Sequence, residues 1–383
     1  MKVVLFHRQW TEYRQPVYRA LERMEGLEVR FCFDLPPCPA DAPSKVIAGN
    51  PLGLWWNWRH ERKIGIYFSP GLIMELLRFR PQVILSEDGS NVVNNAILVA
   101  LRSIIGCRLV LWGLGNIPGR KVSPYKRLAW PLIRFLWRQA DAIVSYSSYG
   151  ARFYTSNGAK PAKVFIAANA LELGDVATRM SEVRLGTELA DLLRGRRLVL
   201  YLGRLVATKR PRDVIDVARR FHAAGHNDVV FLIVGSGPER PRLEQEIELE
   251  GLPNCKVLRG VSLEAATKYL RWAEVCVVPG EGGLVYNHAL AHGVPVVATG
   301  GDGTEFDLIA DGVNGRLVER ADLEALTSAV REVLAHPHYK HHAAATAGKL
   351  PTIAGLAVAL QAALTYACRA QSAPTACDSV NNR

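Results

Sequence analysis

Short apolar runs alternate with amphipathic helical patterns along this chain of 383 residues, and they form two successive sets. Such alternation is typical of β-α-β units around a parallel sheet. In the first set we predict strands over 2–6, 28–33, 82–86, 108–112, 142–147 and 164–168. In the second set we predict them over 197–203, 229–235, 255–260, 275–279 and 295–299. The pattern therefore predicts an α/β protein with two Rossmann-like, doubly wound domains that face each other across a cleft.

A mixed, helical stretch without a strand separates the two sets near residues 170–195. We therefore predict a first domain over 1–175 and a second over 196–340, a number of domains that the length also favours. The Ala-rich pattern over 341–371 predicts helices that pack back on the first domain, and the polar residues 372–383 predict a frayed tail. Ligands of doubly wound domains bind outside the carboxyl ends of the strands, so the cleft between the domains is the expected site.

Composition favours a packed globular protein, because 49% of the residues are hydrophobic and 22% are charged. The seven cysteines are scattered, without a Cys-x-x-Cys pair or zinc-like spacing, which is typical of reduced thiols in a cytosolic protein. The apolar run at the N-terminus is too short for a signal peptide or a membrane span. The apolar stretch IAGLAVALQAALTYA contains Gln361 and predicts a packed helix rather than a spanning one.

The charge is unevenly distributed along the chain. Residues 1–175 hold 23 Lys and Arg against 13 Asp and Glu, whereas residues 176–383 hold 24 against 23. This asymmetry indicates that the first half faces an anionic partner such as a membrane surface, a nucleic acid or a phosphorylated substrate. A solvated basic surface without a partner is the alternative.

Two basic residues follow the first strand of the second set, in the stretch LYLGRLVATKR. The strand ends at Gly203, Arg204 follows at once, Lys209 comes five residues later, and a helix begins near Pro211. Two fixed cations beside a helix N-terminus suit a diphosphate group. The alternative is a loop with solvent-facing charges. In the next glycine turn, VGSGPER, Gly235 allows a close backbone approach to a ligand, although the spacing differs from a dinucleotide fingerprint.

The stretch PGEGGLVYNHALAHG carries a third candidate. Gly283, Leu284 and Val285 stand at the start of a predicted helix, where free N–H groups could hold a phosphate. His288 follows one turn later, where its imidazole could reach a sugar hydroxyl or a ribose. The alternative for His288 is a packing role in the core. Glu281 is the only acid within the turn.

Together with GVPVVATGGDGTEFDLIADGVNGRLV, these stretches resemble in order and spacing the C-terminal half of family-4 (group 1) glycosyltransferases, which have the GT-B fold. The resemblance covers about residues 197–335 closely and extends more weakly to 146–172. It implies that Arg204 and Lys209 hold the diphosphate of a nucleotide-sugar donor. The donor-binding residues that it implies are Gly203, Gly235, Arg259, Gly260, Val261, Gly283, Leu284, Val285 and His288.

The sequence departs from the family pattern at its acidic motif. His288 occupies the place of the second glutamate of the family's Glu-x7-Glu motif, which binds the ribose. The first glutamate of that motif is expected one residue before Glu281. The segment PGEGGLVYNH is similar to a subset of the family with Pro-Gly-x-x-Gly-Leu-x-x-x-His at this place. Arg204, Lys209 and Glu281 are the candidate catalytic residues, and Glu305 and Asp307 are further acids in the region.

The first half is expected to hold the acceptor. The loop HRQWTEYRQPVY follows the first strand, and the run GLGNIPG follows a later one. Many relatives have a histidine in this second run, where the chain has Leu114. The acceptor-side candidates are His7, Trp10, Thr11, Glu12, Tyr13, Arg14, Gly113 and Asn116.

Basic and aromatic residues are concentrated in 119–138. This stretch has no acid, and its six basic residues accompany Trp130, Phe135 and Trp137. A basic amphipathic helix with tryptophans is typical of attachment to an anionic membrane surface. The alternative is a connecting helix with solvated arginines. WWNWRHERK, residues 55–63, is a second basic and aromatic cluster. No nucleic-acid-binding module is recognisable, so nucleic acid is not an expected partner.

The resemblance implies a retaining, metal-independent hexosyltransferase. It would move a sugar from a UDP- or GDP-sugar, a substrate rather than a cofactor, to a lipid-linked or saccharide acceptor in cell-surface polysaccharide or glycolipid synthesis. The expected location is the cytoplasm, peripherally at the inner face of the membrane. Two fixed cations can stabilise a leaving diphosphate without a metal ion. One alternative is a nucleotide-sugar 2-epimerase. The other is a catalytically silent nucleotide-sugar-binding protein, which Leu114 and the altered acidic motif favour.

Overall fold

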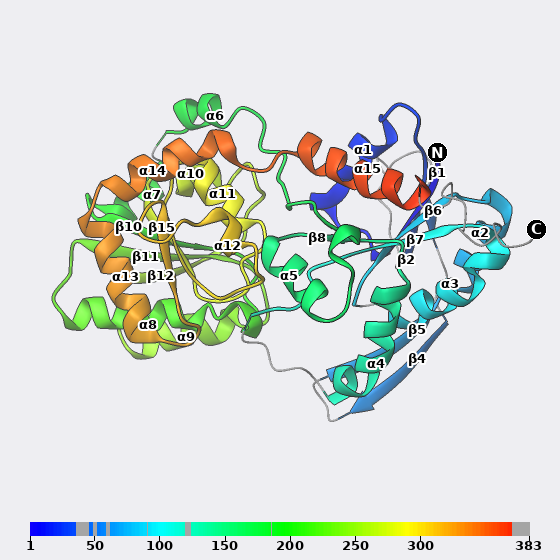
Figure 1. The fold of residues 1–383 in the computed structure, drawn as a ribbon. Coiled ribbons are helices and arrows are strands. Elements are labelled where there is room, and N and C mark those ends of the chain that lie inside the picture. The colour runs from blue at the N-terminus through cyan, green and yellow to red at the C-terminus, as the bar shows by residue number, and fades with distance from the viewer. Residues whose placement is uncertain are drawn as a thin grey trace, which may run out of the picture. The chain divides into compact units, whose positions relative to one another are not determined.

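The chain divides into two compact units (Figure 1). The computed structural model describes residues 1–35, 46–48, 52–58, 62–89, 91–118, 124–184 and 186–369. The first unit comprises residues 1–115, 121–168 and 353–383, and the second comprises 116–120 and 169–352. The chain thus enters the second unit after residue 168, before the predicted boundary at 175. Residues 341–352 also belong to the second unit, and the predicted tail over 372–383 lies outside the described residues.

The first unit is built on a parallel sheet of seven strands in the order β3-β2-β1-β6-β7-β8-β9. The strands are β1 (Lys2–Gln9), β2 (Glu28–Leu35), β3 (Val46–Ala48), β6 (Val83–Glu87), β7 (Arg108–Gly113), β8 (Ala142–Ser145) and β9 (Val164–Ile166). Strands β6, β7 and β8 are almost wholly buried. Strands covered on both faces read as continuous apolar runs, which explains why the sequence pattern identified them.

Helices cover both faces of the first sheet. On one face, α2 (Pro70–Phe79), α3 (Val92–Ile105), α4 (Pro124–Gln139) and α5 (Ser148–Ser156) share a core with β1, β6, β7 and β8. On the other face lie α1 (Gln15–Glu22) and α15 (Ile353–Arg369), which contact each other, and α15 also contacts β6 to β9. The C-terminal helix α15 fits this place because Leu356, Leu360 and Leu364 form one buried stripe along it.

A separate antiparallel hairpin, β4 (Leu52–Trp58) with β5 (Arg62–Phe68), accompanies the first sheet. This hairpin and the edge strand β3 were not predicted from the sequence. The predicted basic and aromatic cluster over 55–63 falls on the hairpin, and its side chains lie outside the described part of the structure. Strand β3 lies at the edge of the sheet, with a partner on one side. It has only three residues, so its apolar run is too short to be distinctive.

The second unit is built on a parallel sheet of six strands in the order β12-β11-β10-β13-β14-β15. The strands are β10 (Arg197–Leu202), β11 (Val229–Gly235), β12 (Cys255–Arg259), β13 (Ala273–Val278), β14 (Val296–Thr299) and β15 (Gly315–Val318). The sequence analysis missed only β15. This edge strand is mostly half-buried, so it lacks the continuous apolar run of its neighbours.

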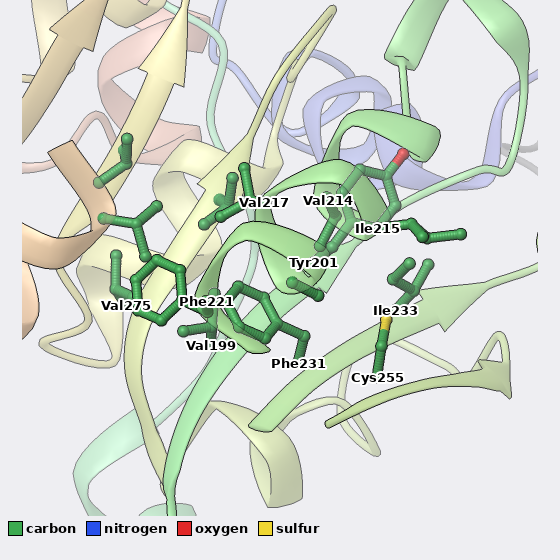
Figure 2. Close-up of a cluster of buried hydrophobic side chains, with 14 of the residues drawn as sticks. Val199, Tyr201, Val214, Ile215, Val217, Phe221, Phe231, Ile233, Cys255 and Val275 are labelled. Carbon is green, nitrogen blue, oxygen red and sulfur yellow. The ribbon is translucent and has the colours of Figure 1, made fainter. Parts of the chain in front are cut away.

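Two hydrophobic cores cover the two faces of the second sheet. On one face α8 (Arg212–Ala223) packs its buried stripe of Val214, Val217 and Phe221 against Val199 and Phe231 of the strands (Figure 2). Helices α9 (Arg240–Leu249) and α13 (Leu323–Ala335) join this core. The other face carries α7 (Thr187–Leu193), α10 (Thr267–Leu270), α11 (Val285–Ala291) and part of α14 (His338–Thr346). Short helices α6 (Val176–Glu182) and α12 (Glu305–Leu308) complete the unit.

The predicted α/β class with two doubly wound parallel sheets is confirmed. Within the described residues, no single helix combines the length and the apolar character that a membrane crossing needs, and only the bent pair 338–349 with 353–369 meets both criteria together.

Candidate functional site

The second sheet has a switch point between β10 and β13. The chain leaves β10 for α8 on one face of the sheet, and it leaves β13 for α11 on the other face. The two connections therefore diverge at the carboxyl edge, which is where doubly wound sheets bind ligands. The loops over 203–211 and 279–284 border this place, and they contain the predicted catalytic residues Arg204, Lys209 and Glu281.

Lys209 links these two loops. Its ammonium group donates to the backbone carbonyl of Glu281 and to that of Gly282, the latter at 3.1 Å. The amide of Glu281 in turn donates to the carbonyl of Thr208 at 3.3 Å. Burial lowers the pKa of Lys209, and Arg204 adds to this effect, while the carboxylates of Asp302 and Glu281 oppose it. Lys209 and Glu281 are thus brought together as the sequence pattern indicated, and Arg204 is exposed beside them.

The glycines of these loops have packing roles that the sequence analysis did not predict. A Cβ atom on Gly280 would stand 2.6 Å from the carbonyl oxygen of Thr208. A Cβ atom on Gly235 would stand 2.0 Å from the carbonyl oxygen of Gly203. The loop after β10 therefore touches its neighbours on both sides, and hydrogen bonds from Gly203 N–H to Val234 and from Leu205 N–H to Ser236 fix it to β11.

The segment at the end of β12 continues this edge. The amide of Gly260 donates to the Ser236 hydroxyl at 3.2 Å, and a Cβ atom on Gly260 would stand 2.8 Å from that oxygen. Arg259 and Val261 on either side of it are exposed. These three predicted donor-binding residues thus lie beside the glycine loop after β11.

An acid occupies the predicted phosphate-facing amide at the start of α11. The Asp302 carboxylate accepts a hydrogen bond from Gly283 N–H and another from Thr304 N–H. The neighbouring Glu305 carboxylate accepts from Gly301 N–H at 2.7 Å and from Gly303 N–H at 2.9 Å. Burial, together with the Asp302 charge, raises the pKa of Glu305.

This contact of Asp302 with Gly283 was not predicted from the sequence. No spacing rule connects an acid after β14 with a glycine after β13. The contact depends on how the two loops meet at the sheet edge.

His288 is buried within α11, with 4% of its surface exposed. Its ring lies 4.9 Å from that of His292, centroid to centroid, and its Nε2 atom has no hydrogen-bond partner in the described structure. Burial, and the neighbouring His292, lower the pKa of His288 to about 3. His288 is therefore neutral near neutral pH, and its buried Nε2 atom remains for a ligand.

The first sheet has its own switch point between β1 and β6, and five predicted acceptor-side residues gather there. His7 Nδ1 lies 2.9 Å from the Tyr18 hydroxyl and 3.1 Å from Arg14 Nη1, and Arg14 Nη2 donates to the Tyr146 hydroxyl. Trp10 stacks on Tyr18 with 5.3 Å between ring centroids. Tyr13 is exposed, 5.6 Å from the Arg14 guanidinium, and Thr11 is half-buried.

Arg14 fixes the tautomer of His7. An arginine side chain only donates hydrogen bonds, so Nδ1 of His7 must accept from it and the ring proton must sit on Nε2. Burial, and the charge of Arg14, hold the pKa of His7 well below its ordinary value. His7 is consequently neutral near neutral pH and presents Nε2 as a hydrogen-bond donor.

The remaining acceptor-side candidates are Gly113, Asn116 and Glu12. A Cβ atom on Gly113 would stand 2.8 Å from Cβ of Asp88 and from the Tyr154 hydroxyl, so the glycine is required by packing. Asn116 belongs to the second unit rather than the first. The side chain of Glu12 lies outside the described part of the structure, although its backbone is in a short 3-10 helix.

Helix α4 occupies most of the predicted membrane-facing stretch, of which 119–123 lie outside the described residues. Ile133, Leu136 and Trp137 are buried, and Trp130 packs edge-on against Trp137. On the opposite side the exposed apolar residues are Leu128, Leu132 and Phe135, with Arg127 and Arg138 exposed nearby.

Among the described residues, no group of three His, Cys, Asp or Glu side chains is placed to hold a metal ion.

We predict that Gly235→Ala lowers the free energy of unfolding of the second unit by about 1–3 kcal/mol, because the new methyl group overlaps the Gly203 carbonyl. Urea denaturation followed by circular dichroism measures this. Gly348→Ala is the matched control, since nothing lies within 4 Å of a Cβ atom there. Unchanged stability with weaker ligand binding would instead make Gly235 a ligand-contacting residue.

We also predict that the His288→Gln variant loses less stability than the wild type when the pH is lowered. The pKa of His288 is about 3 in the folded protein against 6.5 ordinarily, so below about pH 6.5 the unfolded chain takes up a proton that the folded protein refuses. Stability contributed by neutral His288 therefore falls as the pH drops from 6.5 toward 3. Melting temperatures across this range measure the slope. The control His338→Gln, at an exposed position, should show the same slope of melting temperature against pH as the wild type. If His288→Gln also showed the wild-type slope, His288 would not be the residue responsible.

Comparison with known proteins identifies what the site region is similar to. Residues 196–336 match the family model described as glycosyl transferases group 1. An α-D-kanosaminyltransferase of Streptomyces kanamyceticus is 30% identical over 49% of this chain and 48% of its own length. A GDP-mannose-dependent α-(1-6)-phosphatidylinositol monomannoside mannosyltransferase of Mycolicibacterium smegmatis is 30% identical over 60% of this chain and 62% of its own length. The chain thus spans about half to two thirds of these curated relatives.

Solved structures match over nearly the whole chain. Anabaena HepE in complex with UDP has a TM-score of 0.70 at 16% identity, over 95% of this chain and 100% of that one. A sucrose-phosphate synthase of Thermosynechococcus elongatus has a TM-score of 0.69 at 19% identity, over 97% and 100%. The chain therefore has the GT-B fold, and its residues 196–336 match the group 1 glycosyltransferases.

Proposed function

We propose that this protein is a glycosyltransferase that moves a sugar from a nucleoside diphosphate donor to an acceptor. The observation that carries the proposal is the pair Arg204 and Lys209, which stands at the switch point of the second sheet inside the segment that matches group 1 glycosyltransferases. A diphosphate leaving group gains negative charge in the transition state, and preorganised cations lower that barrier. The proposal includes retention of configuration and independence of a metal ion.

The donor is proposed to be a UDP- or GDP-sugar. Support comes from similar proteins: HepE structures contain UDP and UDP-glucose, and the similar mannosyltransferase is GDP-mannose-dependent. His288 supplies a neutral nitrogen for a ribose or sugar hydroxyl, and Glu281 lies beside the Lys209 ammonium. A distal phosphate at Gly283 requires that Asp302 release the Gly283 amide.

The acceptor is proposed to be lipid-linked or a saccharide, in cell-surface polysaccharide or glycolipid synthesis. Names of similar proteins include a phosphatidylinositol monomannoside mannosyltransferase and a poly(glycerol-phosphate) α-glucosyltransferase. Attachment to the inner face of a membrane is part of this proposal, and the exposed apolar stripe of α4 beside Arg127 and Arg138 supports it.

A catalytically silent nucleotide-sugar-binding protein is the second candidate. The specific observation in its favour is the Asp302 carboxylate on the Gly283 amide, because an acid at this place repels a donor phosphate. A 2-epimerase would require acid and base side chains from the first half of the chain. The Nδ1 atom of His7 already accepts from Arg14 and its pKa is lowered, which disfavours this alternative. A thermal-shift screen of UDP- and GDP-sugars, followed by an assay for release of the nucleoside diphosphate, distinguishes the proposed transferase from the silent binding protein. Release supports the transferase, and binding without release supports the silent protein.

We predict that Arg204→Ala and Lys209→Ala each raise the donor KM and lower kcat. A charge-assisted hydrogen bond contributes about 1.5–3 kcal/mol, so kcat/KM should fall roughly 10- to 100-fold. Steady-state kinetics with varied donor measures both constants. Arg220→Ala, an exposed charge at the far end of α8, is the control and should match the wild type. Unchanged kinetics in both site variants would remove the diphosphate assignment.

We predict that the protein cosediments with vesicles containing anionic lipid at low salt and is released at high salt. The double variant Leu132→Glu, Phe135→Glu should remain in the supernatant, because it places acids on the exposed face of α4. Leu249→Glu, which replaces an apolar residue of α9 that is 78% exposed, is the control and should still sediment. Equal sedimentation of all three proteins would reject α4 as the attachment site.

A further inference from the structure

Within the part of the chain that the structure describes, five buried polar atoms without a hydrogen-bond partner occur at the switch point of the first sheet. They are Nε2 of His7, Nε1 of Trp10, Oγ1 of Thr11, Nε of Arg14 and Nε1 of Trp112. Native proteins contain few such atoms, because a buried donor without an acceptor destabilises the folded state. His7 and Trp112 are almost completely buried, with 0% and 1% of their surfaces exposed, so protein atoms or a ligand must satisfy them.

These five residues are here called the donor cluster; His7, Arg14 and Trp112 contact one another directly, and Trp10 and Thr11 are linked to them through neighbouring groups. The His7 and Trp112 rings lie 5.1 Å apart, and the Arg14 guanidinium lies 5.4 Å from the Trp112 ring. Trp10 reaches His7 through Tyr18, which stacks on Trp10 and whose hydroxyl is 2.9 Å from His7 Nδ1. Thr11 lies between Trp10 and Arg14 in the chain, and its carbonyl accepts from the Arg14 amide at 3.0 Å. The residues that carry the unsatisfied atoms therefore lie in one region of the first unit.

The unsatisfied groups of the donor cluster are hydrogen-bond donors. Arginine and the two indoles have no acceptor atom, and the Thr11 hydroxyl can donate. His7 Nε2 carries the ring proton because Nδ1 accepts from Arg14. A neutral sugar hydroxyl both donates and accepts, so in a cluster of donors its own O–H group finds no acceptor. An ionised phosphate or carboxylate only accepts, and it matches this cluster.

Arg14 also supplies a positive charge that forms no ion pair with the described side chains. No carboxylate among the described side chains lies within ion-pair distance of Arg14, although Glu87 is near enough to interact electrostatically. Its guanidinium instead contacts the rings of Trp112 and Tyr146 and donates to a tyrosine and to His7. Arg14 is half-buried. A charge that is partly removed from water and has only neutral hydrogen-bond partners is costly, and an anionic ligand offsets that cost.

We propose that the donor cluster binds an anionic group, a phosphate or a carboxylate, and that this group belongs to the acceptor. The second half of this statement rests on the proposed transferase function, whereas anion binding by the cluster does not. The excess of 23 basic over 13 acidic residues in 1–175 agrees with an anionic ligand for this part of the chain.

The two indole N–H groups allow a direct test by nuclear magnetic resonance. Indole signals of ¹⁵N-labelled protein are assigned with Trp10→Phe and Trp112→Phe, and inorganic phosphate and acetate are titrated at constant ionic strength. The expected result is a saturable downfield shift of the Trp10 and Trp112 signals, because an N–H that gains an anionic acceptor is deshielded. Arg14→Gln should weaken the anion affinity by about tenfold or more.

Matched variants separate this site from the proposed donor site and from misfolding. Arg204→Gln should leave the indole shifts as in the wild type. If Arg14→Gln does not fold, Thr11→Val and Arg14→Lys serve in its place, since the first removes one hydroxyl and the second keeps the charge without the planar donor array. Both should weaken anion binding.

Glycerol 3-phosphate and phosphatidylcholine vesicles that contain phosphatidic acid distinguish a soluble from a lipid source of the phosphate. Shifts with both indicate a lipid headgroup, and shifts with glycerol 3-phosphate alone indicate a soluble acceptor. The proposal is overturned if neither anion moves the two indole signals, or if glucose moves them equally. Because the readout needs no turnover, a protein without transferase activity could still pass this test, and an active one could fail it.

Discussion

The ammonium group of Lys209 holds together two loops that the order of the second sheet sends to opposite faces. The chain goes from β10 to a helix on one face and from β13 to a helix on the other, so the carboxyl edge opens between them. Lys209 spans this place by donating to carbonyls of the β13 loop. One side chain therefore supplies both the closure of the loops and the positive charge that a diphosphate needs. Arg204, Glu281 and the start of α11 take their positions from this closure.

Close backbone contact accompanies this link, and it explains the glycine-rich character of the stretches around it. Gly235 and Gly280 lie where any Cβ atom would overlap a carbonyl of the β10 loop. The same glycines that suggest a ligand clamp in the sequence are thus required by loop-on-loop packing. This packing brings the amides and carbonyls of three loops to one edge, so that structural necessity and a polar site arise from the same contacts.

The sequence predicted the parts of the fold that are determined by burial. Strands such as β6 and β11 are covered on both faces, and their uninterrupted apolar runs identify them. The hairpin β4 and β5 and the edge strands β3 and β15 escaped prediction because their residues need not be uniformly apolar. Lys209 and Glu281 could be placed together because strand ends meet at one edge. The contact of Asp302 with Gly283 could not, because it joins two loops through side-chain geometry that no periodicity encodes.

Charge separates the two switch points more than their topology does. In the second sheet the Lys209 cation is accompanied by carbonyl oxygens and by the nearby carboxylates of Asp302 and Glu281. In the first sheet Arg14 has neutral partners, and Glu87 forms no ion pair with it. A cation balanced within its own chain can exchange one anionic partner for another, as a reversible donor site requires. A cation surrounded by unsatisfied donors has no such internal partner, so its balance depends on a ligand that brings the negative charge with it.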